Sequence, residues 1–114
     1  MHELGISRSI VAIVEEAAKG KRVRKVTLEI GELSGVLSDA IRFCFHAVAQ
    51  GTCAEDATLE IDDIKAHARC TECAIEFATP TLFTTCRCGA RALVRLRGEE
   101  INVRSIEVEE TAHV

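Results

Sequence analysis

Apolar side chains recur every three or four residues near the start of the chain, which is the period of an amphipathic helix. The pattern covers residues 3–19, and Gly20 then follows as a typical C-terminal stop. We expect one face of this helix to lie against the core. The apolar positions of that face are Ile6, Ile10, Ile13, Val14, Ala17 and Ala18.

The pattern then changes to alternation, the period of a half-buried strand. In KVTLEIGEL, the residues Val26, Leu28 and Ile30 alternate with polar ones, and the following GELSG predicts a turn. Ser38 is placed to cap a second helix. The buried face of that helix should contain Ile41, Cys44, Phe45 and Val48.

Alternating segments return later in the chain. ATLEIDDIKAHARC begins as a strand and runs into a pair of cysteines, and ALVRLRGEEINVRSIEVEE predicts two strands about Gly98. In the last strand the apolar positions change parity between Val103 and Ile106. We therefore expect a β-bulge near Arg104 and Ser105.

Together these elements predict an α+β fold in which a small mixed sheet of about three strands packs with two helices. A cysteine-rich stretch interrupts the pattern, and a bound metal could take the place of a core there. We expect residues 67–94 to form an inserted, zinc-ribbon-like domain. Residues 1–66 and 95–114 should form one discontinuous domain, whose sheet the final strand rejoins.

Composition and the expected compartment indicate whether the cysteines are disulfides or metal ligands. With 114 residues, 47% of them hydrophobic, the chain suits a globular domain with a small appended module. A net charge of −4 argues against nucleic acid or an anionic membrane as the main partner. No apolar run could span a bilayer and no signal peptide is evident, so we expect a cytoplasmic protein. In that reducing compartment, closely spaced cysteines are more often metal ligands than disulfides.

Two close pairs of cysteines, CTEC and CRC, are separated by twelve residues and supply Cys70, Cys73, Cys86 and Cys88. Each pair can fold back as a tight turn, a knuckle, that presents both of its sulfurs to one ion. Four thiolates from two knuckles match the closed tetrahedral geometry of structural zinc, and zinc binding would fold the segment. Iron takes the same ligands and stays open as an alternative. A thioredoxin-like redox pair lacks its activating helix N-terminus. His67 could lie near the metal as a neighbouring group.

The first three residues, MHE, offer a second set of metal ligands. The amine or carbonyl of Met1 and the amide and imidazole of His2 lie within a few bonds of one another, and Glu3 adds an amide and a carboxylate. Ni(II) and Cu(II) favour planar or tetragonal sets of nitrogen and oxygen donors. Terminal histidines are more often solvated, however, so these residues alone leave both interpretations open.

The chain also carries motifs in a particular order: MHELGISRSI, LEIGELSGV, RFCF, HARCTEC with a downstream cysteine pair, and VRSIEVEE. This series resembles the HypA/HybF family of nickel-insertion accessory proteins for nickel-iron hydrogenase, and the similarity covers essentially the whole chain. It implies a nickel metallochaperone, not an enzyme. The resemblance places transported Ni(II) on Met1, His2 and Glu3, and structural Zn(II) on the four cysteines of a separate small domain.

The resemblance also implies partners. Family members deliver nickel to the hydrogenase large subunit with an accessory GTPase, and some serve urease maturation, so urease accessory proteins are candidates as well. A second copy of the chain is a further candidate. We expect neither nucleic acid nor a membrane as a partner.

Two positions depart from the family pattern. The second cysteine pair is one residue shorter than the usual C-x-x-C. Some members take an extra acidic nickel ligand from the loop after the first strand, and the equivalent point here falls near Val36 and Leu37, flanked by Glu32 and Asp39.

Two other functions remain as alternatives. A zinc-ribbon module that binds nucleic acid or protein would need a basic, aromatic face for nucleic acid, yet the chain has four Phe, no Tyr or Trp, and an acidic balance. A thiol oxidoreductase is the enzymatic alternative. For nickel transport, the ligand nitrogens must lose protons, so we expect affinity to fall as the pH drops through the imidazole range.

Overall fold

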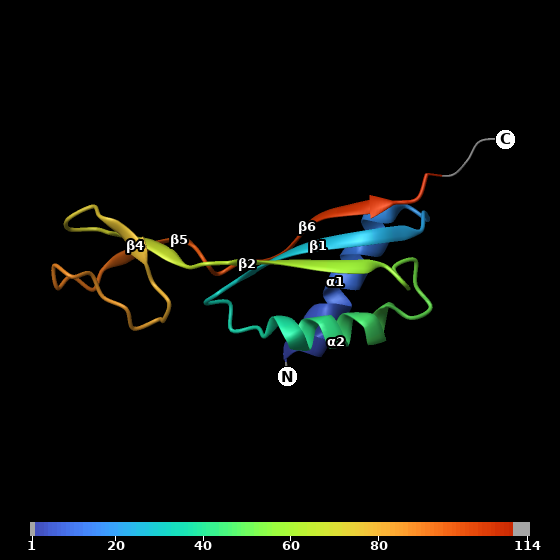
Figure 1. The fold of residues 1–114 in the computed structure, drawn as a ribbon, viewed down its shortest axis with the longest axis horizontal. Helices are drawn as coiled ribbons and strands as arrows, with labels where there is room; N and C mark the ends of the chain where they lie inside the picture. Colours follow the sequence, from blue (N-terminus) through green and yellow to red (C-terminus); the bar gives the residue numbers. More distant parts are fainter. Residues whose placement is uncertain (1, 111–114) are drawn as a thin grey trace.

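The computed structural model describes residues 2–110, with only the backbone described for His2. Within this part of the chain there are two helices and six strands, arranged as a body with a second, smaller unit at one end (Figure 1). In chain order the elements are α1 (His2–Ala18), β1 (Val23–Gly31), α2 (Ser38–Ala49), β2 (Thr58–Ile64), β3 (His67–Cys70), β4 (Glu76–Ala78), β5 (Leu93–Arg97) and β6 (Ile101–Val108).

The body is built on the first sheet, whose strand order is β2-β1-β6. The central strand β1 pairs in parallel with β2 and antiparallel with β6, so the sheet is mixed. Val26, Leu28 and Ile30 of β1 are buried, and they form one core with side chains of both helices. Burial of a single face explains the alternation in the sequence. The predicted α+β fold, with a three-stranded mixed sheet and two helices, is confirmed.

The buried face of α1 differs from the prediction. Ile10, Val14 and Ala18 are buried as expected, but Val11 is buried too, and Ile13 is 53% exposed. Ala17 is also exposed. The physical reason is that α1 packs against α2 as well as against the sheet, which turns its buried face toward α2. Ile13 therefore lies at the edge of the contact with β6.

The start of α2 also differs from the prediction. Ser38 is the first residue of the helix and does not cap it, because the N-cap position belongs to Leu37 and no side chain caps the helix there. The Ser38 hydroxyl instead donates a hydrogen bond of 2.7 Å to Oδ1 of Asp63, at the end of β2. A charged acceptor forms the stronger hydrogen bond, so the hydroxyl joins the helix to the sheet.

The last strand returns to the body, as predicted. Thr27 pairs with Ser105 and Leu28 pairs with Val103, so Arg104 is the extra residue of a β-bulge. This bulge moves the later apolar residues of β6 back to the core face. The predicted change of parity and its position are confirmed.

The second sheet has the strand order β4-β3-β5, with both pairings antiparallel. It extends from one end of the body, away from both helices (Figure 1). The two strands predicted about Gly98 both form, but they belong to different sheets: β5 pairs with β3, and β6 pairs with β1.

Tight backbone packing joins the two sheets. A Cβ atom at Gly31 would overlap the backbone of Gly98, and a Cβ atom at Gly98 would overlap Ala66. Hydrogen bonds close the same region: the Leu33 amide donates to the Gly98 carbonyl at 2.7 Å, and the Ala66 amide donates to Oε1 of Glu32 at 2.9 Å. The junction therefore requires glycine at two of its positions.

This packing predicts that Gly31→Ala lowers the free energy of unfolding by about 3 kcal/mol, the upper end of the cost of overpacking. Urea unfolding of the zinc-loaded protein measures the change. Gly5→Ala is the matched control, because Gly5 lies in α1 with open space around it. Alanine should stabilise the helix there by up to about 1 kcal/mol. Equal stability of Gly31→Ala and the wild type would contradict the account of the junction.

Neither helix of the described residues has the length and the apolar character that crossing a membrane requires.

Candidate metal centres

The structure brings the four predicted cysteines of the second sheet together. Cys70 ends β3, Cys73 follows in the turn toward β4, and Cys86 and Cys88 lie in the loop before β5. The four sulfur atoms lie within 4.8 Å of one another. The Sγ atoms of Cys70 and Cys88 are 3.7 Å apart, and those of Cys73 and Cys86 are 3.5 Å apart.

The first knuckle directs backbone N–H groups at a sulfur. The amides of Glu72 and Cys73 approach Sγ of Cys70 at 3.4 and 3.5 Å. A left-handed backbone at Ala74, with φ of 64°, closes the turn. The N–H groups of Cys73 and then Glu72 stabilise the thiolate and lower the pKa of Cys70 to about 7. Cys70 is therefore prepared to act as an anionic ligand.

The second knuckle is shorter but reaches the same cluster. The Gly89 amide donates to the Cys86 carbonyl at 2.8 Å, and φ of 95° at Gly89 makes this tight turn possible. The backbone N–H of Cys88 lowers the pKa of Cys86, but burial and the neighbouring sulfurs outweigh it and raise that pKa to about 12. Four thiols this close cannot all ionise without a cation among them.

The geometry and the donor set fit a zinc ion. A tetrahedral site with Zn–S bonds of about 2.3 Å places its sulfurs about 3.8 Å apart, close to the two shortest separations here. The other buried side chains of this unit are small. Besides Cys70 and Cys86, they are those of Ala66, Ala68 and Thr79. So small a core makes a bound metal the main source of stability for the second sheet.

His67 lies in β3, three residues before the first cysteine, and is not part of the sulfur cluster. Its Nδ1 atom is 3.4 Å from the carbonyl oxygen of Lys65. The structure thus places this ring against the backbone that connects β2 to β3.

The predicted nickel ligands lie at the edge of the described structure. Met1 and the side chain of His2 are outside the described residues. Glu3 lies in the first turn of α1, where its Oε2 atom accepts a hydrogen bond of 3.3 Å from the Leu37 amide. This contact joins positions 34 residues apart and brings the start of α1 beside the start of α2 (Figure 1).

The loop after β1 contributes backbone, not a carboxylate, at this point. Val36 and Leu37 are apolar, and Leu37 uses its amide to contact Glu3. Glu32 binds the Ala66 amide at the junction between the sheets. Asp39 is exposed in the first turn of α2. No pattern in the sequence indicates the contact between Glu3 and Leu37, although an acidic side chain near an uncapped helix N-terminus is a common arrangement.

Comparison with known proteins gives consistent similarities over nearly the whole chain. The family model HypA, described as hydrogenase/urease nickel incorporation, metallochaperone, matches residues 1–108. Hydrogenase maturation factor HypA of Trichormus variabilis is 51% identical over 110 residues, which are 96% of this chain and 97% of that protein. Its counterpart from Geobacter sulfurreducens is 46% identical, over 96% of this chain and 100% of that protein.

Solved structures agree with this. The solution structure of the Ni metallochaperone HypA from Helicobacter pylori superposes with a TM-score of 0.69 at 26% identity, covering 95% of this chain and 97% of that one. A second solution structure of a HypA protein gives a TM-score of 0.72 at 27% identity, covering 96% and 97%.

Proposed function

Because this chain belongs to the HypA family of hydrogenase and urease nickel-incorporation metallochaperones, we propose that it carries Ni(II) on its N-terminal segment and holds Zn(II) in the four-cysteine cluster. The chain is a maturation factor and not an enzyme, in a family that binds nickel and structural zinc. The observation that carries the proposal is the family match over residues 1–108, which includes MHE and both cysteine pairs.

We propose Met1, His2 and Glu3 as the residues that hold nickel. Because α1 begins at His2, the first amides of the helix have no acceptor within it. The positive end of the helix dipole makes loss of an amide proton easier, and a deprotonated amide is a nitrogen donor of the kind that Ni(II) favours. The Glu3 carboxylate supplies negative charge at the same place. Its contact with Leu37 supports a fixed position for this segment against α2.

Cys70, Cys73, Cys86 and Cys88 are the proposed zinc ligands. Bound zinc would supply structure and no reaction, since all four coordination positions are filled by sulfur. We propose that residues 67–94 form the zinc domain, and that residues 1–66 and 95–114 form the nickel domain. The second sheet begins at His67, which supports the first boundary, and β5 runs across the second one.

The partners of the chain belong to hydrogenase maturation. Within that process, we propose exchange of nickel with the accessory GTPase and delivery to the large subunit of nickel-iron hydrogenase. Urease accessory proteins are further proposed partners. A site at a chain terminus suits this exchange, because few groups need to move for nickel to pass to another protein.

Acid should release nickel, which tests the proposed imidazole ligand. Imidazoles titrate near pH 6.5, and only the neutral ring can bind metal. Nickel affinity should therefore be at least about tenfold lower at pH 5.5 than at pH 7.5. Titration with Ni(II) in the presence of a competing chelator measures this. A wild-type affinity that stays constant over the window would contradict the proposal.

A further inference from the structure

Each exposed sulfur of the four-cysteine cluster lies against a buried one. Cys73 and Cys88 are exposed, whereas Cys70 and Cys86 are buried. The Sγ atom of Cys88 lies 3.7 Å from that of Cys70. The Sγ atom of Cys73 lies 3.5 Å from that of Cys86. A sulfur that solvent reaches therefore contacts a buried sulfur of the other knuckle.

The exposed sulfurs also lack the backbone hydrogen bonds that the buried ones receive. The N–H groups of Glu72 and Cys73 approach Sγ of Cys70, and the N–H group of the fourth cysteine acts on the third. Among the described residues, no backbone N–H is hydrogen-bonded to Sγ of Cys73 or Cys88. A hydrogen bond draws electron density from a thiolate and lowers its nucleophilicity. The two exposed sulfurs are therefore the most accessible and the most nucleophilic of the four.

Such a pair of sulfurs is suited to oxidation by hydrogen peroxide. A thiolate attacks one oxygen of the peroxide, becomes a sulfenic acid and releases hydroxide. The neighbouring thiolate attacks the sulfenic sulfur, forms a disulfide and releases a second hydroxide. One peroxide thus takes two electrons from each pair. Two disulfides remove all four anionic ligands, so Zn(II), whose oxidation state does not change, leaves the cluster.

We propose that the four-cysteine cluster is a peroxide-sensitive switch, in which two disulfides between the knuckles replace the zinc ion. One disulfide joins Cys70 to Cys88, and the other joins Cys73 to Cys86. The geometry favours this pairing because each bridge joins a sulfur that peroxide reaches to the sulfur that it already contacts. The inference rests on the proposed function, because it takes these four cysteines as the zinc ligands.

Loss of zinc should alter one part of the chain only. The second sheet has a small core and extends from one end of the body, away from both helices (Figure 1). The first sheet has a separate core, which it forms with α1 and α2. The switch would therefore disable the zinc domain and leave the N-terminal segment on a folded body.

Zinc release from the full chain tests the proposal. The chain is loaded with zinc, a small excess of hydrogen peroxide is added, and a coloured zinc indicator follows the release. All of the zinc should leave, and a dithiol reductant with added Zn(II) should restore the loaded protein. The matched control combines Cys44→Ser with Cys53→Ser, which lie outside the cluster and should leave the rate unchanged. Zinc that stays bound overturns the proposal.

A second variant isolates the role of the exposed thiols. Cys73→His combined with Cys88→His keeps four ligands of the kinds that structural zinc takes, but it leaves no exposed thiol in the cluster. Peroxide should release zinc from this variant at least about tenfold more slowly than from the wild type. An equal rate of release overturns the proposal.

Peptide mapping of the oxidised wild type identifies the disulfides without any substitution. Trypsin cleaves after Arg87 and chymotrypsin after Phe77, which places the third and fourth cysteines on separate peptides, apart from the first pair. Fragmentation should join Cys88 to Cys70, and the third cysteine to the second. Any other pairing contradicts the switch alone. A wild type that binds no zinc before peroxide is added would instead contradict the zinc ligands as well.

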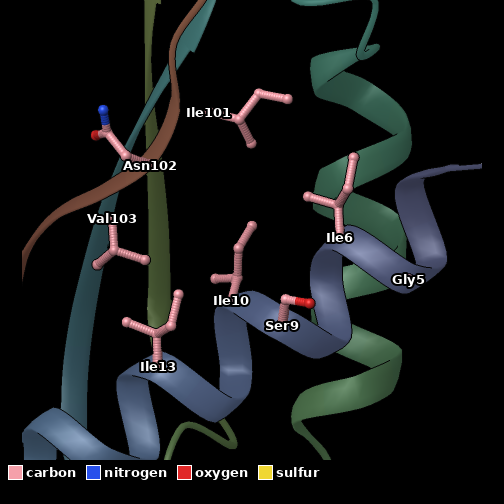
Figure 2. Close-up of a pocket in the computed structure, with 8 residues that line it drawn as sticks. All are labelled: Gly5, Ile6, Ser9, Ile10, Ile13, Ile101, Asn102 and Val103. Atoms are coloured by element: carbon pink, nitrogen blue, oxygen red, sulfur yellow. The ribbon is translucent and has the colours of Figure 1, made fainter.

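Isoleucine methyl resonances show which part of the chain responds. Ile75 is the single isoleucine of residues 67–94. Ile10 is buried in the body, where it lies between α1 and β6 together with Val103 (Figure 2). Peroxide should shift the Ile75 resonance and leave that of Ile10 in place. An unchanged Ile75 resonance, or the collapse of both signals, overturns a switch confined to the zinc domain.

Discussion

Replacing Cys70 by serine should abolish zinc binding and unfold the second sheet, while the first sheet stays folded. Cys70 is buried, and its Sγ atom accepts hydrogen bonds from two backbone N–H groups. The same atom lies 3.7 Å from Sγ of Cys88 in the sulfur cluster. Structural zinc contributes on the order of 10 kcal/mol to small metal-dependent domains, far more than this unit's small buried side chains can replace. Metal analysis should show the loss of zinc from the variant.

Hydrogen exchange would show where the structure is lost. The amides of β3 and β5 should lose their protection in Cys70→Ser, whereas those of Val26 and Leu28 in β1 should keep theirs. Cys44→Ser is the matched control, because Cys44 is a partly buried thiol on α2 outside the cluster. A Cys70→Ser protein with protected β3 amides and no zinc would show that the second sheet does not depend on the metal.

An extension of Gly-Ser ahead of Met1 should weaken nickel binding at least about 100-fold. The extension converts the terminal amine, a proposed nickel ligand, into an amide. Loss of a ligand should cost more than loss of a group that only supports one, which already lowers metal affinity by about 10- to 100-fold. Competition titration with Ni(II) measures the effect. The same two residues added after Val114 should leave affinity unchanged. Equal affinity of the two extended proteins would place nickel away from the terminal amine.

Much of the fold could be predicted because its causes are local. One buried face of the first sheet produces the alternation of Val26, Leu28 and Ile30, and the change of parity in β6 marks its bulge. The sequence-based predictions that were wrong concern contacts between helices and strands. A helical period identifies apolar positions, but it does not say that Val11 is buried while Ile13 is exposed beside β6.

The same distinction applies to the metal sites. Ligand type and spacing indicate the sulfur cluster because each cysteine pair folds as a local knuckle. The contact of Glu3 with Leu37 depends on how two helices pack, and no local pattern reports it. Leu82 and Phe83 would be expected in a core on hydrophobicity alone. They are exposed because the second sheet is too small to cover them.

The most direct test of nickel transport at the N-terminus is the content of both metals in the wild type, His2→Ala and His46→Ala. His46 is exposed on α2 and controls for the loss of an imidazole elsewhere. Each protein is loaded with Ni(II) and Zn(II), and the bound metals are counted. We predict that His2→Ala loses nickel and keeps zinc, while His46→Ala keeps both. Nickel bound equally well by His2→Ala and the wild type would contradict the account.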